Sequence, residues 1–312
     1  MREDYQMMVK AYQEAGGTPD IFRASKVAHL VVHKNKVLGS HLVEGLILNA
    51  KETDCGVDID LTVEKGIRIA YPVHLCFGIL PKEGRQEIKV NALIRKEAEI
   101  KILAHCVFPD AVNVQHIMEA KIVLEDKALF QYDEVHYHGL TGGVEVIPQA
   151  TIKVGKRAHL DTNFSLLKGR VGKLSIDYQA EVDENGVLEM LTKIYGYGED
   201  KIRVKESGKL LGEGARGLIR SRIAVRDRAE SEVISELEAS APNTRGHVDC
   251  IEIVQGKAKA KAVLPVNVLH EKAQGTHEAA IGRVNQKELE TLMAGGLKEE
   301  EAIDIIIGRM LK

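Results

Sequence analysis

The feature that most restricts the fold of this chain is a long run of strand-like segments between residue 86 and about residue 270. Apolar and polar residues alternate in them, which is the pattern of a strand with one buried face. Helical patterns that could connect parallel strands are absent from this run, and two-residue hairpin signals are few. The pattern predicts a mainly β chain and leaves a sandwich, a barrel or a β-solenoid. Examples of the segments are Glu87–Val90, Lys121–Leu124, Lys173–Tyr178 and Cys250–Val254.

The kinds of apolar residue bear on the choice among these three folds. Hydrophobic residues make up 44% of the chain, but aromatic residues only 4%, and there is no Trp. A solenoid stacks small aliphatic side chains on its inner face, so this composition matches a solenoid. Periodicity by itself leaves the sandwich and the barrel open.

Both ends of the chain show helical spacing instead. Residues 1–15 predict one helix that stops at Gly16–Gly17, and residues 285–294 and 297–311 predict two more. The last one has an apolar face, which fits either a cap on the end of the solenoid or a docking surface for a partner. We therefore divide the chain into a helical segment (1–25), a β core (26–275) and a C-terminal helical region (276–312). The residues of the apolar face are Ala302, Ile303, Ile306, Met310 and Leu311.

Charge and hydropathy exclude several classes of function. The net charge of −3 gives no basic field for nucleic acid or for an anionic membrane surface. No apolar run approaches the roughly 20 residues of a membrane span, and the N-terminus lacks the apolar core of a signal peptide. Four scattered cysteines without a CxxC pair do not predict a disulfide framework. These features predict a cytoplasmic protein that binds neither nucleic acid nor membrane.

The common enzyme motifs are also missing. Gly169–Lys173 has the wrong glycine spacing for a phosphate-binding loop, so the chain is not expected to hydrolyse ATP. His270 and His277 are seven residues apart, which does not fit a helical zinc-protease motif. Acidic residues are too numerous to mark a glycosidase pair. A solenoid enzyme acting on polysaccharide remains only a minor alternative.

What remains is a set of possible metal ligands. Cys250 has His247 three residues before it and His277–Glu278 downstream. A thiolate, an imidazole and a carboxylate together suit iron, an iron–sulfur cluster or zinc, although a single strand cysteine is more often part of a core. His136 and His138 lie on one face of a strand and are better explained as an exposed or hydrogen-bonded pair. Cys106, which follows His105, is likewise either a metal ligand or a core residue.

Several stretches resemble the SufB/SufD family, the scaffold of the Suf iron–sulfur cluster assembly machine. The C-terminal stretch His277–Val284, continuing through Gln286–Leu289 to Gly295–Ala302, is similar to the family's C-terminal signature. Pro72–Gly78 resembles its early strand region. His105–Pro109, followed by His116, resembles the Gly-Cys-x-Ala-Pro segment of SufB. The likeness runs over most of the chain after about residue 25.

This resemblance implies a right-handed parallel β-helix between helical ends, which favours the solenoid among the folds left open. It implies a scaffold without enzymatic activity of its own. It also implies that an ABC-type ATPase, SufC, binds the C-terminal helices and hydrolyses the ATP. Pairing through the β-helices and a sulfur donor protein complete the expected partners. The expected cargo is iron and a transient iron–sulfur cluster.

The resemblance also implies roles for single residues. Cys250 and Glu278 match the Cys and Glu of SufB, and His277 matches a histidine that SufD contributes. A single chain that carries the SufB-type Cys and Glu together with the SufD-type His implies a short, homodimeric SufB-like protein. Each protomer of the dimer would then supply every type of ligand. Cys106 matches a SufB cysteine inside the β-helix, where sulfur would enter.

The sequence also departs from the family. It lacks the Cys-rich N-terminal segment of some SufB proteins, and His136–Gly139 replaces a usual Asn-Trp. These differences leave a flavin role and the route of sulfur delivery in doubt. The alternative function is an adaptor that docks or regulates the ATPase without holding a cluster, with Cys250 purely structural.

Overall fold

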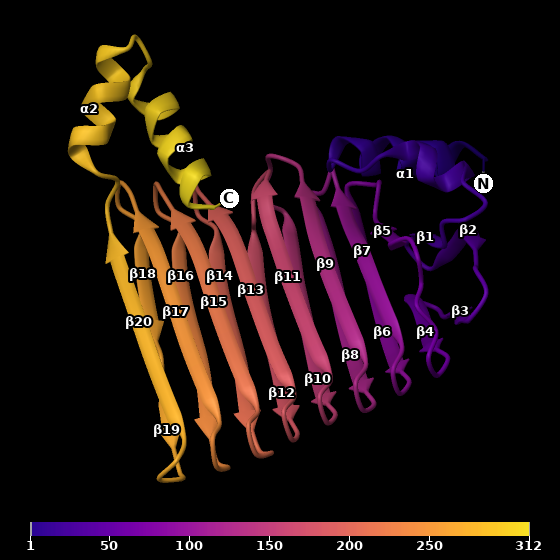
Figure 1. Cartoon of the computed structure of the whole chain (residues 1–312). Coiled ribbons are helices and arrows are strands. Elements are labelled where there is room, and N and C mark those ends of the chain that lie inside the picture. Colours follow the sequence, from indigo (N-terminus) through magenta and orange to yellow (C-terminus); the bar gives the residue numbers. More distant parts are fainter. Residues whose placement is uncertain (1, 312) are drawn as a thin grey trace.

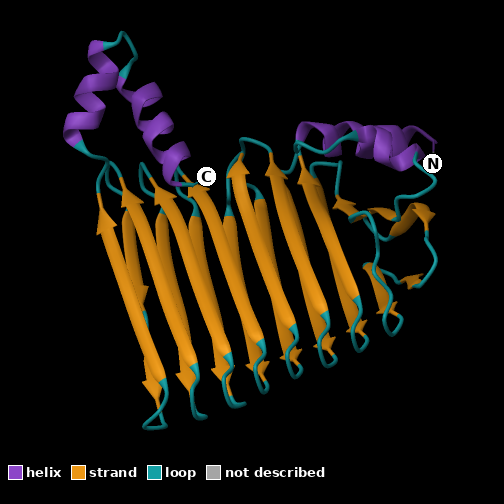
Figure 2. Cartoon of the chain, viewed as in Figure 1, coloured by secondary structure: helices purple, strands orange, loops and turns teal. Residues whose placement is uncertain are grey.

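Two ten-stranded sheets run the length of the molecule, and the chain passes from one sheet to the other at nearly every strand. The result is a β-solenoid of about eight turns with helices at both ends (Figure 1). The computed structural model describes residues 2–311. This architecture confirms the mainly β prediction, with one helix before the solenoid and two after it (Figure 2).

We call the two layers sheet A and sheet B. In spatial order, sheet A contains β2 (Lys36–His41), β1 (His29–His33), β5 (Val73–Gly78), β7 (Glu99–Phe108), β9 (Leu129–His138), β11 (His159–Lys168), β13 (Val187–Gly196), β15 (Arg216–Val225), β17 (Arg245–Val254) and β20 (Gln274–Gly282). From the same end, sheet B contains β3 (Leu46–Glu52), β4 (Gly56–Val63), β6 (Glu83–Ile94), β8 (Asn113–Leu124), β10 (Val144–Val154), β12 (Lys173–Val182), β14 (Lys201–Leu210), β16 (Glu230–Ala239) and β18 (Lys259–Val263), and β19 (Val266–Val268) also pairs with β16.

The core lies between the two sheets, along the axis of the solenoid. Alternate residues of each strand point inward, and these are the buried ones, as in β13 and β16. Neighbouring strands are parallel except at the first turn, where β1 pairs with β2 and β3 with β4 in antiparallel fashion. Because the register is continuous, residues of successive turns form straight rows across a sheet.

One corner of the solenoid repeats a left-handed backbone position. Glu97, Lys127 and Arg157 have φ values of 61°, 60° and 56°, although such values are unfavourable for residues other than glycine. The amide of each donates to a carbonyl one turn further on, for example Glu97 N to Asp126 O and Lys127 N to Lys156 O. This hydrogen-bond ladder offsets the strain. A fully buried alanine follows each of the three positions (Ala98, Ala128 and Ala158).

Helices cover parts of one long edge of the solenoid. Helix α1 (Arg2–Glu14), followed by the 3₁₀ helix η1 (Pro19–Arg23), packs Met8, Ala11 and Tyr12 against the first strands of sheet A. Helices α2 (Gln286–Ala294) and α3 (Glu299–Met310) lie at the other end (Figure 1). Among residues 2–311, no helix is both long and apolar enough to cross a membrane.

Helix α3 uses more of its surface for internal packing than the sequence alone indicates. Ala302, Ile306 and Ile307 are buried together with Ala224 of β15 and Val284. Ile305 remains 42% exposed and Met293 of α2 41% exposed. A partner that docks on these helices would therefore meet Ile305 and Met293, not Ile306.

Candidate functional site

The first candidate site lies at the C-terminal end of sheet A. Cys250 is on β17 with its side chain directed inward, and it is fully buried. Its Sγ lies 3.9 Å from Oε1 of Glu252, the next inward residue of the strand. Burial, reinforced by the Glu252 carboxylate, raises the pKa of the Cys250 thiol to about 12. Cys250 is thus a neutral thiol at physiological pH as long as it stays covered.

The neighbouring strand β20 carries His277 and Glu278. His277 pairs with Val248 and therefore faces inward, on the same face as Cys250 and offset from it by two residues. Glu278 pairs with Asp249 and faces outward. Within one chain the fold thus brings Cys250 and His277 to one face and puts Glu278 on the other. Both β20 residues are exposed because β20 is the last strand of sheet A.

His247 is not part of this site. It lies an odd number of residues from Cys250 on the same strand, so its ring points to the outer face. There its Nδ1 is 2.8 Å from the hydroxyl of Thr276. The combination of Cys250 with His247 suggested by sequence proximity is therefore wrong.

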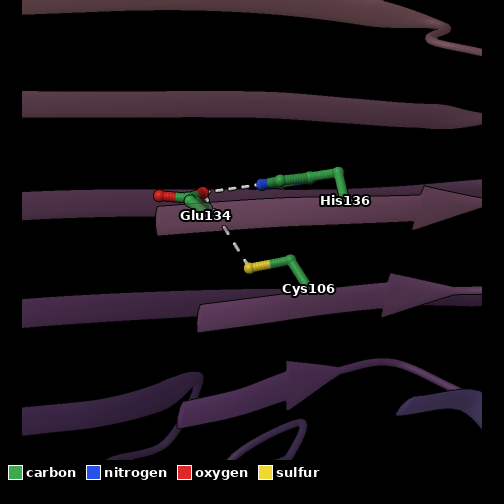
Figure 3. Close-up of side chains that lie close together, drawn as sticks. All are labelled: Cys106, Glu134 and His136. Atoms are coloured by element: carbon green, nitrogen blue, oxygen red, sulfur yellow. Dashed lines mark hydrogen bonds and ion pairs between the residues drawn. The ribbon is translucent and has the colours of Figure 1, made fainter. Parts of the chain in front are cut away.

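A second cluster lies inside the solenoid around Cys106. Cys106 on β7 pairs with His136 on β9, and Glu134 is the preceding inward residue of β9. Glu134 Oε1 is 2.6 Å from His136 Nε2 and 4.0 Å from Cys106 Sγ (Figure 3). One donor atom from each residue lies within 4.8 Å of the other two, and all three side chains are buried. Burial and the Glu134 carboxylate raise the pKa of the Cys106 thiol well above its ordinary value.

Hydrogen bonds fix the orientation of this cluster. His138 Nδ1 lies 2.9 Å from the carbonyl oxygen of Arg170, and since a carbonyl only accepts, this nitrogen carries a hydrogen. Burial lowers the pKa of His138 to about 3, so its ring is neutral and its Nε2 is an acceptor. That Nε2 lies 3.2 Å from His136 Nδ1, which must donate to it. Tyr132 donates to Glu134 Oε2 at 2.9 Å. His136 and His138 are thus the hydrogen-bonded pair that the sequence favoured.

A row of inward side chains, polar except at Phe164, connects the two cysteine sites. In sheet A, inward row partners lead from Glu134 through Phe164, Thr192 and Ser221 to Cys250. In sheet B, Tyr178, Glu206 and Ser235 form a second inward row. Within the described chain, the hydroxyls of Ser221 and Ser235 have no hydrogen-bond partner. The sequence analysis missed these residues, although each occupies an inward position of an alternating strand where an apolar side chain is expected.

Comparison with known proteins identifies the family of the chain. The profile of the SufBD core domain, described as SUF system FeS cluster assembly, matches residues 89–309. The chain belongs to the SufBD family. The matched range begins in β6 and ends in α3, so it includes both cysteine sites of this SufBD protein.

Full-length archaeal relatives support the same assignment. The chain is 35% identical over 311 residues to the SufBD family protein MJ0034 of Methanocaldococcus jannaschii, covering 100% of this chain and 98% of that protein. It is 32% identical to the SufBD family protein PH0883 of Pyrococcus horikoshii, covering 99% and 94%. The similarity to SufB of Bacillus subtilis is 19% over 252 residues, or 78% of this chain and 53% of SufB. The SufBD protein is thus similar to these archaeal proteins along nearly its whole length.

Proposed function

We propose that this SufBD protein is a cytoplasmic scaffold on which iron–sulfur clusters are assembled at the C-terminal end of sheet A. The observation that carries the proposal is the common inward face of Cys250 and His277 across the last two strands. A thiolate and an imidazole, joined by the Glu278 carboxylate, form a mixed ligand set for iron. Such a set releases a cluster more readily than four thiolates would.

The assembly site needs the end of the solenoid to be paired with a second copy. Strand β20 leaves one edge unpaired within residues 2–311, and most of its residues are exposed. An exposed strand edge is a template for pairing with another chain. In a homodimer joined there, Glu278 of each copy would lie at the seam. This arrangement would supply the carboxylate that one chain holds on its outer face.

Opening of the seam would change the chemistry of Cys250. Iron binding requires the thiolate, and the covered thiol has a pKa of about 12. Exposure to water removes most of the burial cost and favours deprotonation by an incoming ferrous ion. In the proposed cycle, a SufC-like ABC ATPase bound to α2 and α3 provides the movement that opens the seam. Iron and sulfide are the cargo.

Sulfur delivery is assigned to Cys106, with a donor protein as the source. Cys106 is fully buried, so only a small sulfur species could reach it without opening of the strands. The polar row through Thr192 and Ser221 supports a path from there to Cys250 inside the solenoid.

The complete burial of Cys250 favours one alternative. A buried strand thiol of high pKa is the usual state of a structural cysteine. In that case the protein would be an adaptor that docks or regulates the ATPase without holding a cluster.

Anaerobic reconstitution with ferrous iron and sulfide tests the proposal. All variants carry Cys55→Ser, because Cys55 is the exposed cysteine and would bind iron non-specifically. We expect the visible absorbance of a cluster in this background and its loss in Cys250→Ser. Cys76→Ser is the matched control, because Cys76 is equally buried but packs beneath α1, away from the seam. Equal clusters in the Cys250 variant would refute the assigned site. ATPase binding without any cluster would favour the adaptor.

A further inference from the structure

We propose that Cys106, Glu134 and His136 form an internal site for a divalent transition metal such as Zn²⁺ or Fe²⁺. The site goes beyond the cluster ligands Cys250, His277 and Glu278, and it shares Cys106 with the proposed sulfur delivery, so metal and sulfur would bind that thiol alternately. The Glu134 and Cys250 positions are four rows apart in sheet A, or about 19 Å at ~4.8 Å per row. The two sites therefore cannot share one ion.

The first argument comes from the contact between Glu134 and His136. His136 Nδ1 lies 3.2 Å from His138 Nε2, so Nε2 is the nitrogen of the His136 ring that faces the carboxylate. Nε2 and Oε1 are 2.6 Å apart, which is a hydrogen-bond distance, so a shared proton joins them. A metal ion that replaced this proton would take both atoms as ligands, because each directs a lone pair at the other.

The surrounding side chains favour the metal ion. His116 on β8 faces the same interior and is 1% exposed, with its ring centroid 6.0 Å from that of His136. Neither ring nitrogen of His116 has a hydrogen-bond partner among residues 2–311. Unpaired buried polar groups are costly. A proton on His136 would satisfy only the contact with Glu134, whereas a metal ion would also engage Cys106.

The donor set selects the type of ion. Thiolate and imidazole ligands suit Zn²⁺, Fe²⁺ or Co²⁺ and do not suit Mg²⁺ or Ca²⁺. Bond lengths of about 2.0–2.3 Å in a tetrahedral site place donor atoms about 3.3–3.7 Å apart. The cluster's 4.8 Å limit lies above this range and the Oε1–Nε2 distance of 2.6 Å lies below it, so metal binding requires side-chain shifts of about 1 Å. A cavity of about 60 Å³ lined by Tyr132 and Glu134 adjoins the cluster and leaves room for them.

Charge and orientation also fit. Metal binding would release the thiol proton of Cys106 to solvent, and the thiolate and the Glu134 carboxylate together would neutralise the dication. A buried site with no net charge avoids most of the desolvation cost. His136 is held through His138 by the Arg170 carbonyl, and Tyr132 holds Glu134. Such outer hydrogen bonds orient the ligands of protein metal sites.

Cobalt is the probe for this site. The Cys55→Ser protein would be expressed in medium with Co²⁺, so that the ion is present while the interior forms. We expect a thiolate-to-cobalt absorption band and about one bound cobalt per chain. Cys106→Ser should remove the band, and His136→Gln should lower the cobalt content several-fold. Glu206→Gln, which changes another buried carboxylate of the interior, should leave both unchanged.

The outcomes separate this site from the assembly site. A band that survives in folded Cys106→Ser protein, or no band in the parent protein, overturns the internal site. A band lost in Cys250→Ser but kept in Cys106→Ser places cobalt at the seam, which supports the assembly site alone. If Cys106→Ser does not fold by circular dichroism, Cys106→Ala replaces it and should likewise lack the band. An internal cobalt site without cluster reconstitution would overturn the assembly role alone.

Discussion

The pKa of the buried Glu206 carboxyl group shows how strongly the interior of the solenoid affects a single residue. Glu206 accepts a hydrogen bond of 2.7 Å from the Thr192 hydroxyl, while its second oxygen has no partner within the described chain. Burial raises the pKa of Glu206 from 4.5 to about 7, although the Thr192 bond opposes the shift. The group is thus largely protonated in the folded state at mildly acidic pH.

This shift predicts a pH dependence of stability. The folded state binds the Glu206 proton more tightly than the unfolded state, so the stabilisation is complete below pH 4.5 and is lost as pH rises to about 7. The maximum loss is ~3 kcal/mol. In denaturant unfolding, the free energy of unfolding of the Glu206→Gln variant should therefore not show this fall as the pH rises. Parallel pH curves for the variant and the parent would show that Glu206 ionises normally in the folded protein.

The two interior cysteines differ in how they could become reactive. The Cys250 thiol lies next to the last strand, so movement of β20 would expose it. The Cys106 thiol is enclosed several turns from that end, within a cluster of possible metal ligands. Similar burial thus leaves the two thiols with different access to the surface.

At the scale of elements, α3 has two apolar faces with different tasks. Ile306 is 7% exposed and is buried together with Ala224 and Val284, whereas Ile305 is 42% exposed. Adjacent residues of a helix point about 100° apart, which explains how one helix can both cap the solenoid and offer a docking face.

This division predicts opposite results for two neighbouring substitutions. Ile305→Asp should abolish co-purification with the ABC-type ATPase while leaving the unfolding transition unchanged, because the side chain already faces solvent. Ile306→Asp should destabilise the α3 packing by several kcal/mol, because it buries an unpaired charge. Retention of the ATPase by the Ile305 variant would exclude this face as the docking surface.

At the scale of the whole molecule, the two ends of sheet A differ in how their edge strands are covered. At the N-terminal end, α1 packs against the first strands, whereas β20 at the other end has an exposed edge that is unpaired within residues 2–311. Natural proteins usually protect such edges, so an open one indicates an interface.

The open edge predicts a dimer that charge can disrupt. The parent protein should have twice the chain mass of 34.4 kDa by light scattering. The double substitution Ala280→Lys and Ile281→Lys should yield monomers, because pairing would bring four added positive charges together. Val123→Lys, at an exposed position of β8 in mid-solenoid, is the control and should remain dimeric. A dimeric edge variant would show that the copies pair elsewhere.

Part of the solenoid's geometry can be read from the sequence. The alternation of apolar and polar residues predicts the strands and which side chains face inward. Buried alanines at Ala98, Ala128 and Ala158 mark turns of about 30 residues. That period would also have connected Cys106 with His136, because they are row partners on adjacent turns. The opposite faces of Cys250 and His247 follow from their odd spacing alone.

The sequence by itself thus determined a mainly β chain with helical ends, and it carried the resemblance to the SufB/SufD family. Only the tertiary structure decided that Glu134 meets Cys106 and that Glu278 turns away from Cys250. The reason is that these contacts depend on the register between turns, which the corner geometry and the packing of both sheets set together. Local alternation specifies which way a side chain points, but the register specifies what it meets.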